Sequence, residues 1–411
     1  MTTPSEKVLK ILSSLLDMDW IAYHSSLKAD IEWCIYVIKE QKIYQTNIQA
    51  DKEELIEYVN WAVNEQLEVA EQEIPIKIDT YMNIPLYEKY GSEIESLLAD
   101  SHKWDFDIFN FEIVTENQSL QIMTNHLLSL YNLYQILSFD NKKFMSFINE
   151  IQNGYHKDNF YHNATHAADV VQSFYYMLNT CQAIDICKLN DFDIGVCIIS
   201  AAIHDYDHPG VNNIFLINTY HSLAIMYNDK SVLENFHVAS AFKVLYEENN
   251  NFIEGVQKED SKRFRMKCIG LVLATDFARH FTDLGKFQLR FSNCGVTDEE
   301  DRLLVMEMMM HASDIGNPSR PWKFCYEWAN KVMNEFFAQG DKEREMGLTI
   351  SNLCDRHSVI IPKAQIGFIE LFIEPTFNIL EIVLPNVNEN VKYAIENKEH
   401  WKETMDNNNA N

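Results

Sequence analysis

Residues 161–170 read YHNATHAADV and carry two histidines four positions apart, His162 and His166. Residues four apart are neighbours on the surface of an α-helix, so a helix through this stretch would present both imidazoles on one face. The surrounding residues follow a helical period, and the chain shows no convincing alternation of period two. The stretch therefore predicts a helix that presents two imidazoles to a common site.

Two further stretches add imidazole and carboxylate groups. Residues 204–210 read HDYDHPG, and residues 311–318 read HASDIGNP. In the first stretch His204 and Asp205 are adjacent and can face one ion together. The two oxygens of Asp205 could bridge two ions about 3.5–4 Å apart, as in two-metal phosphoester hydrolases. Imidazole and carboxylate together suit hard or borderline divalent cations, so these stretches predict a metal-dependent hydrolase.

Asp314, in the second stretch, follows an apolar run of three methionines at positions 308–310 that we expect to be buried. A carboxylate at the end of a buried run costs several kcal/mol unless it is paired or bound to a metal. A helix cap or a salt bridge would also satisfy it. Because His204 and Asp205 supply further ligands, metal ligation is the preferred interpretation.

The composition predicts an all-α fold. The 411 residues are 46% hydrophobic, which is enough for a sizeable core, yet the chain has only 12 glycines and 9 prolines. So few turn-forming residues favour long helices joined by short loops. Breaks in the helical period fall at Gly154, Gly340 and residues 205–210, 293–295 and 316–321.

A formal net charge of −27 argues against a nucleic-acid backbone or an anionic membrane as partner. It would also repel a small anionic substrate unless bound cations reverse the local field, which is an independent reason to expect metals. The eight cysteines form no CxxC pair, and several lie in apolar runs, so they are expected to be reduced core residues of a cytoplasmic protein. No apolar run approaches the ~18–20 residues of a membrane helix, so no membrane span is expected.

Three regions are expected along the chain. Residues 1–100 should form a helical, acidic N-terminal region, with Pro75, Pro85 and Gly91 in a looser link to the second region. Residues 101–395 should form the catalytic domain, and residues 396–411 a polar tail. The N-terminal region could pack on the catalytic domain or form a homodimer contact. Its acidic character argues against calmodulin binding, because calmodulin targets are normally basic amphipathic helices.

Six blocks in a fixed order resemble one known family. Residues 161–170, 204–210, 273–276 and 365–368 are similar to motifs of the class I cyclic-nucleotide phosphodiesterase catalytic domain, and residues 227–235 and 336–341 match the same pattern. The resemblance covers residues 104–390 and implies an all-helical member of the HD-type metal-dependent phosphohydrolases. Six ordered motifs are specific where any one of them would be weak.

The resemblance implies roles for the polar residues of these blocks. The four ligands that it implies for a zinc-type ion are His166, His204, Asp205 and Asp314. Asp205 would also touch a second ion, Mg2+ or Mn2+. The three side chains that would hold waters around the ions are His208, Glu234 and Thr275. His162 matches the general acid of the family rather than a ligand.

A purine pocket is expected around Gln365 and Phe368, which are three apart and so share one helical face. The amide of Gln365 can donate and accept hydrogen bonds at a purine edge, and Phe368 offers a plane for stacking. The resemblance places Val332 opposite Phe368, with Tyr161 nearby. Asn317 is a residue type often seen in family members that accept cAMP, so cAMP is favoured over cGMP.

The expected reaction is hydrolysis of 3′,5′-cyclic nucleotides to nucleoside 5′-monophosphates, which would terminate cyclic-nucleotide signalling. A water activated between two divalent ions would attack phosphorus, and His162 would protonate the departing 3′ oxygen. Two alternatives are an HD-type phosphohydrolase that acts on other nucleotides and a cyclic-nucleotide-binding scaffold without turnover. One departure from the family pattern is Phe236, which stands where many relatives have a second histidine before His237.

Overall fold

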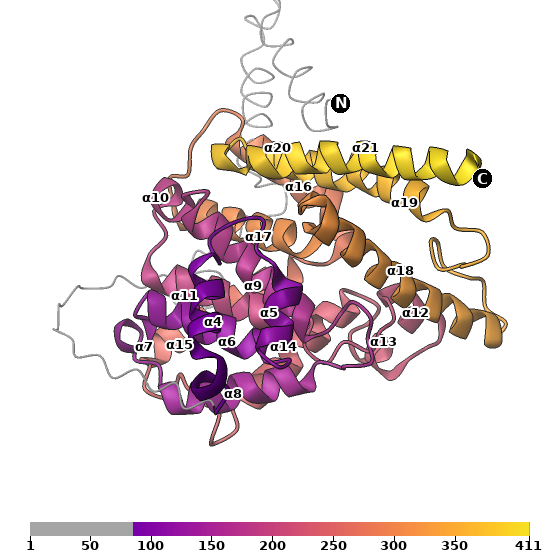
Figure 1. Cartoon of the computed structure of the whole chain (residues 1–411). Coiled ribbons are helices and arrows are strands. Elements are labelled where there is room, and N and C mark those ends of the chain that lie inside the picture. Colours follow the sequence, from indigo (N-terminus) through magenta and orange to yellow (C-terminus); the bar gives the residue numbers. More distant parts are fainter. Residues whose placement is uncertain (1–84, 411) are drawn as a thin grey trace, which may run out of the picture. The chain divides into compact units, whose positions relative to one another are not determined.

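The computed structural model describes residues 85–410, and it describes side-chain surroundings for residues 91–406. These residues form α-helices joined by short helical segments and loops, and no strand occurs among them, which confirms the predicted all-α fold (Figure 1). The expected N-terminal region lies outside the described residues as far as residue 84. None of the described helices combines the length and the apolar character needed to cross a lipid bilayer.

The helices follow one another along the whole described range. The first group is α4 (Pro85–Ala99), α5 (Ile108–Val114), α6 (Ser119–Leu130), α7 (Leu133–Ile136), α8 (Asn141–Gly154), α9 (Ala164–Asn179), α10 (Ala183–Cys187), α11 (Asp191–Ile203), α12 (Asn213–Asn218), α13 (Ser222–Met226) and α14 (Val232–Leu245). The second group is α15 (Lys258–Leu273), η3 (Phe277–Arg279), α16 (His280–Phe291), α17 (Glu299–Ile315), η4 (Asn317–Ser319), α18 (Trp322–Glu345), α19 (Ile361–Phe368), η5 (Ile369–Ile373), α20 (Glu374–Leu380), η6 (Pro385–Val387) and α21 (Asn388–Ala410).

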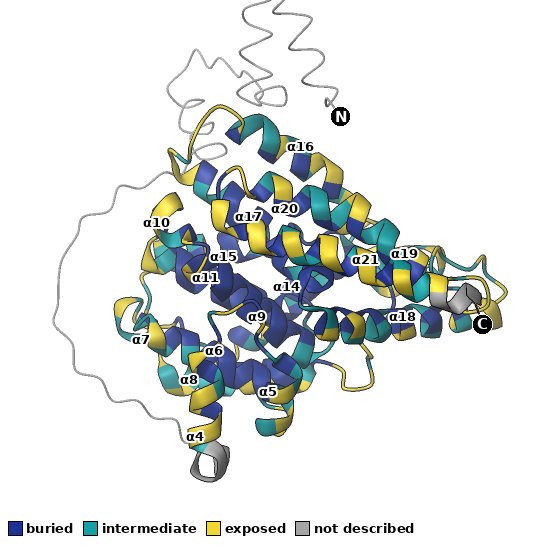
Figure 2. Ribbon diagram, turned by 45° about the horizontal axis from the view of Figure 1, so that its top comes forward, coloured by how far each residue is buried: buried dark blue, intermediate teal, exposed yellow. Residues whose placement is uncertain are grey.

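Helices α9 and α11 lie in the buried centre of this array (Figure 2). Every residue of α11 from Asp193 to Ile203 is buried, which explains why its sequence is apolar on all sides rather than on one face. The helix begins with a capping box in which the Asn190 side chain accepts from the Asp193 N–H and the Asp193 side chain accepts from the Asn190 N–H. His204, which follows the last residue of α11, is therefore held in the buried interior of the described chain.

The start of α9 differs from the prediction. Asn163 has an extended backbone, and its side chain accepts hydrogen bonds from the backbone N–H groups of Thr165 and His166. It is therefore the N-cap, and α9 begins at Ala164. His166 lies in the first turn of the helix, whereas His162 precedes the cap. The expectation that both imidazoles share one helical face is wrong, because a strong N-cap residue stands between them.

Two glycines that were expected to interrupt the helical pattern lie inside helices. Gly91 is within α4, which begins at Pro85, and Gly340 is within α18. A Cβ on Gly340 would lie 1.9 Å from the carbonyl oxygen of Cys354, so glycine is needed here for close packing against a neighbouring segment. The other expected breaks fall at the end of α8 or between α-helices.

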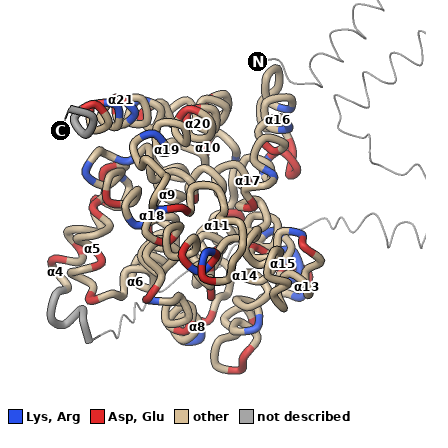
Figure 3. The backbone as a smooth tube through the Cα atoms, turned by 90° about the vertical axis from the view of Figure 1, so that its right-hand side faces the viewer, with Lys and Arg blue, Asp and Glu red and all other residues tan. Residues whose placement is uncertain are grey.

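Helix α21 includes almost all of the residues that were expected to form a polar tail. Trp401 in this helix is 1% exposed, and its ring centroid lies 4.8 Å from that of Trp322 and 5.6 Å from that of Tyr326 in α18. Lys398 pairs with Glu374 at 2.6 Å, and acidic and basic residues lie side by side along α21 (Figure 3). As far as Trp401, this segment is packed on the helices of the catalytic region.

Candidate metal centre and active site

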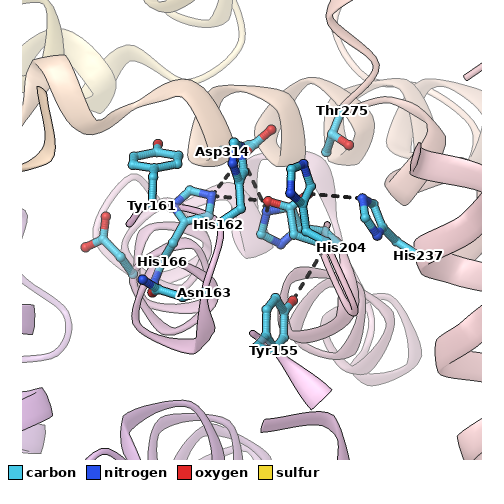
Figure 4. A network of polar contacts seen from close by, with 12 residues as sticks. Tyr155, Tyr161, His162, Asn163, His166, His204, His237, Thr275 and Asp314 are labelled. Atoms are coloured by element: carbon cyan, nitrogen blue, oxygen red, sulfur yellow. Dashed lines mark hydrogen bonds and ion pairs between the residues drawn. The ribbon is translucent and has the colours of Figure 1, made fainter. Parts of the chain in front are cut away.

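Three segments far apart in the sequence supply the four predicted metal ligands. His166 comes from the first turn of α9, His204 from the end of α11, and Asp314 from the last turn of α17. Asp205 follows His204, and its backbone N–H donates to the Tyr155 hydroxyl at 3.3 Å. Figure 4 shows the imidazoles of His166 and His204 and the carboxylate of Asp314 pointing toward one another. The structure thus brings all four predicted ligands together.

The distances between the ligand atoms are short. His166 Nε2 lies 3.1 Å from Asp314 Oδ1 and 3.6 Å from Asp205 Oδ2. His204 Nε2 lies 3.2 Å from Asp205 Oδ2 and 3.3 Å from Asp314 Oδ1. The four atoms all lie within 4.8 Å of one another, so one cation could contact all of them.

The surroundings of His204 fit a metal ligand. Its Nδ1–H donates to the carbonyl oxygen of Ala201 at 2.8 Å, which leaves the lone pair on Nε2 for a cation. Nε2 is buried and has no hydrogen-bond partner. Burial disfavours charge on His204, yet the carboxylates of Asp205 and Asp314 raise its pKa well above the usual value. The point where the four side chains meet therefore favours positive charge.

The two carboxylates respond in the opposite sense. Burial alone would raise the pKa of Asp314, but its hydrogen bond with His166 and the nearby imidazole of His204 lower it. The pKa of Asp205 is also lowered, because the charge of His204 outweighs the effect of burial. Both groups are therefore ionised, as cation ligands must be.

The second oxygen of Asp205 faces away from this cluster. Asp205 Oδ1 lies 3.7 Å from Nε2 of His237, while Oδ2 faces His166 and His204. Nδ1–H of His237 donates to the carbonyl oxygen of Tyr206 at 2.7 Å, and burial lowers the pKa of His237 to about 4, so its Nε2 is an unprotonated acceptor. Asp205 can therefore contact two ions on opposite sides. No role was predicted for His237, because it is a single histidine in a helix without a second ligand nearby in the sequence.

The structure gives His162 a partner that was not predicted. Nδ1–H of His162 donates to Oε1 of Glu335 in α18, and the backbone N–H groups of Tyr161 and His162 donate to Oε2 at 2.8 and 3.1 Å. Burial disfavours charge on His162, but the Glu335 carboxylate outweighs it and raises the pKa to about 9. At Glu335, burial would raise the pKa, but the charge and the hydrogen bond of His162 outweigh it and lower the pKa to about 2. His162 is thus held in one orientation and carries a proton at neutral pH.

Three residues were predicted to hold waters around the ions. The ring of His208 stacks on that of His162 with centroids 4.0 Å apart, and burial lowers its pKa well below the usual value. Glu234 accepts two hydrogen bonds from the Asn213 amide at 3.1 Å, and burial, reinforced by Asp276, raises its pKa to about 7. The Thr275 hydroxyl donates to the carbonyl oxygen of Val272 at 2.8 Å. All three predicted residues are buried.

The predicted purine-pocket residues come from several elements. Gln365 and Phe368 both lie in α19, as their spacing predicted, and Val332 is half-buried in α18. The ring of Phe368 stacks on that of Phe277 with centroids 6.0 Å apart. Tyr161 and Asn317 are in contact, because the Tyr161 hydroxyl donates to Asn317 Oδ1. Phe277 is an aromatic neighbour of Phe368 that was not predicted.

Comparisons with known proteins agree with this geometry. A profile of the family described as 3′5′-cyclic nucleotide phosphodiesterase matches residues 161–394. The chain is also 34% identical over 307 residues to a Caenorhabditis elegans protein named probable 3′,5′-cyclic-AMP phosphodiesterase pde-4, in an alignment that covers 72% of this chain and 45% of that relative. The chain thus spans less than half the length of this curated relative. With the four predicted cation ligands and the histidine–glutamate pair inside the matched range, the chain belongs to the 3′,5′-cyclic nucleotide phosphodiesterase family.

Proposed function

We propose that this protein hydrolyses 3′,5′-cyclic nucleotides to nucleoside 5′-monophosphates, with cAMP as the favoured substrate and cGMP as an alternative one. The observation that carries the proposal is the convergence of four cation ligands beside a protonated histidine. The name of the Caenorhabditis elegans relative supports cAMP. Asn317 supports it as well, because an asparagine amide can pair with both the acceptor and the donor of an adenine edge.

The donor set indicates which ions the site would hold. Two imidazoles and two carboxylates suit Zn2+, so we assign it to the four residues His166, His204, Asp205 and Asp314. Asp205 Oδ1, with waters held by His208, Glu234 and Thr275, suits Mg2+ or Mn2+, which prefer oxygen ligands and retain several waters. When bound, two divalent cations would lower the pKa of water beside the phosphorus and neutralise charge on the phosphate oxygens.

His162 supplies the proton in this reaction. As water attacks phosphorus in line with the 3′ oxygen, His162 donates its proton from Nε2 to that oxygen, because Nδ1 is engaged with Glu335. Glu335 orients the ring and keeps it protonated until the bond to the 3′ oxygen breaks. Gln365, Phe368 and Val332 would hold the base, and Tyr161 and Asn317 would complete the pocket. All seven cysteines among the described residues are free, and of these only Cys294 is exposed, which supports a reducing compartment such as the cytoplasm.

The test is steady-state hydrolysis of cAMP and cGMP, measured side by side with and without a chelator and after addition of zinc and manganese. We expect turnover that is lost with the chelator and restored by the metals. The matched variant His162→Ala should still bind metal but turn over at least about 100-fold more slowly, because it lacks the proton donor.

Two results would contradict the proposal. Dephosphorylation of nucleoside monophosphates without action on either cyclic nucleotide would indicate an HD-type phosphohydrolase of another specificity. Binding of metal and cyclic nucleotide without product in a single-turnover assay would indicate a scaffold. Near-normal turnover by His162→Ala would remove the role proposed for that residue alone.

A further inference from the structure

Phe277 is a large aromatic side chain that lies partly exposed beside the predicted purine pocket. It begins η3 and is 43% exposed. Its ring is nearly parallel to that of Phe368, with an interplanar angle of 14° and centroids 6.0 Å apart. It also contacts Phe372, with centroids 4.7 Å apart, and Phe372 in turn contacts Phe368 at 5.2 Å. The residue that we propose to stack on the base is therefore one of a cluster of three phenyl rings.

The two stacked rings leave one face of Phe368 for a base. A purine inserted between them would need planes separated by about 7 Å, twice the contact distance of ~3.5 Å between carbon atoms. The planes of two nearly parallel rings cannot be farther apart than their centroids, which here are 6.0 Å apart. A base that stacks on Phe368 therefore lies on the face that Phe277 does not cover, and Phe277 supports the ring from the other side.

Phe277 is held in place by a buried pair of histidines. Its ring lies against that of His280, with centroids 5.5 Å apart and an interplanar angle of 24°. Nδ1 of His280 lies 2.8 Å from Nε2 of His311, so one of these nitrogens donates its hydrogen to the other. His280 is 2% exposed and His311 is 4% exposed. Because His311 lies in α17, this hydrogen bond ties the segment that carries Phe277 to the helix that carries Asp314.

The backbone at Phe277 is fixed as well. Asp276 caps η3, because its Oδ1 accepts from the backbone N–H of Ala278 at 2.9 Å. Its Oδ2 accepts from the Ser231 hydroxyl at 2.6 Å. Phe277 therefore lies in a segment that is anchored by Asp276 before it and by His280 after it. A ring in such a segment can restrict a neighbouring ring without itself turning away.

We propose that Phe277 is a positioning residue that holds the ring plane of Phe368 ready to stack on the purine. This rests on the proposed function, in which Phe368 stacks on the base. The second side-chain torsion of a phenylalanine is broad, so a ring without a neighbour can turn, and the loss of that freedom on binding weakens affinity. Because Phe277 restricts Phe368 before the substrate arrives, less freedom is lost. Every base has an aromatic face, so cAMP and cGMP should depend on Phe277 equally.

The variant Phe277→Ala removes the supporting ring. KM for cAMP and for cGMP should each rise about three- to tenfold, the range expected for one aromatic contact. The kcat should stay within about twofold, because stacking on the base is the same in the ground state and the transition state. Phe277→Leu keeps an apolar side chain without a ring plane, so it should raise KM as well. Phe277→Tyr keeps the ring and should restore the wild-type KM. Initial-rate kinetics on both substrates give these constants.

KM separates positioning from stability, because a loss of folded protein lowers the apparent kcat and leaves KM unchanged. The matched control is Phe281→Ala. Phe281 is 65% exposed, and its ring contacts those of His280 and Phe372 but not that of Phe368. Its removal should therefore leave KM for both substrates within about twofold of the wild-type value, since the contact behind Phe368 remains.

A double-mutant cycle separates support of Phe368 from direct contact between Phe277 and the nucleotide. Phe368→Ala should raise KM for both substrates, because the base loses the ring on which it stacks. If Phe277 acts through Phe368, adding Phe277→Ala to this variant should raise KM no further. If Phe277 contacted the nucleotide itself, the second substitution would raise KM again.

Several outcomes overturn this inference while hydrolysis of cyclic nucleotides stands. An unchanged KM in Phe277→Ala or in Phe368→Ala is one, and an equal rise of KM in Phe281→Ala is another. A wild-type KM in Phe277→Leu, or a KM in Phe277→Tyr that matches the alanine variant, would show that the ring plane is not what matters. A further rise of KM in the double variant would mean that Phe277 does not act through Phe368. A wild-type enzyme that hydrolyses no cyclic nucleotide overturns the proposed function instead.

Discussion

The predicted metal-ligand cluster comes from α9, α11 and α17, whereas most of the predicted purine pocket comes from η4, α18 and α19, and the side chains of the two regions are held in different ways. In the cluster, the Nε2 atoms of His166 and His204 lie 3.1 and 3.3 Å from Oδ1 of Asp314. In the pocket, the Asn317 amide donates from Nδ2 to Asp169 and accepts at Oδ1 from the Tyr161 hydroxyl. The Gln365 side chain, in contrast, makes no hydrogen bond with another described residue. The contacts in the cluster favour a single arrangement of its side chains. The pocket combines the amide of Asn317, which its partners orient, with the amide of Gln365, which can rotate.

This difference indicates where substitutions should have large effects. Removal of a ligand from the cluster leaves charged groups facing one another without their counter-charge, which is costly in a buried site. Removal of a single neutral hydrogen bond from the pocket costs about 0.5–1.5 kcal/mol. We therefore expect the metal cluster to be far less tolerant than the purine pocket.

The largest effect is expected for Asp314→Ala. The variant lacks an anionic ligand, so bound metal should be lost, and kcat/KM for cAMP should fall by about a thousandfold, which corresponds to several kcal/mol of transition-state stabilisation. Elemental analysis of the purified protein and steady-state kinetics measure the two effects. Asp341→Ala, a change of a partly exposed carboxylate that pairs with Arg356, is the control and should retain both metal and activity. Full metal content in Asp314→Ala would show that the cluster tolerates change as the pocket does.

An intermediate effect is expected for Glu335→Gln, which preserves shape but removes the charge beside His162. A general acid acts only while it is protonated. The kcat/KM of the wild-type enzyme should therefore fall above the pKa of His162, which is about 9. Without the carboxylate, burial lowers the pKa of His162, and the alkaline limb of the profile should move down by about one to two pH units. Measurement of kcat/KM from pH 6 to 10 reports this shift. An alkaline limb at the wild-type position would mean that Glu335 does not control this proton.

The smallest effect is expected for Gln365→Ala. Loss of one amide that binds the base should raise KM for cAMP by about tenfold with little change in kcat, because the interaction is present in the ground state as well as in the transition state. Initial-rate kinetics on cAMP and cGMP give both constants. An unchanged KM for both substrates would remove Gln365 from the pocket.

Several features of the fold and site could be predicted without the structure. The all-α class follows from helical periodicity and scarce turn residues, and both are local properties of the chain. The break at 205–210 was predicted, but the position of His162 was not, because the N-cap at Asn163 outweighed the i, i+4 spacing of the two histidines. Gly340 was predicted to break the helical pattern. Glycine is needed there because the carbonyl of Cys354 packs against it, and this contact cannot be read from the local sequence.

By itself the sequence determined which residue types could hold the cations. Only a few side chains bind divalent metals, so His204, Asp205 and Asp314 stand out wherever the chain later places them. The tertiary structure alone decided the hydrogen-bond partners of His162 and Asn317. His162 donates from Nδ1 to Glu335, and Asn317 donates from Nδ2 to Asp169 Oδ2 at 2.7 Å. These partners lie 173 and 148 residues away, and a carboxylate carries no local signal of the donor that it will meet after folding. A hydrogen bond depends on where two atoms arrive in space, which packing of the helices determines.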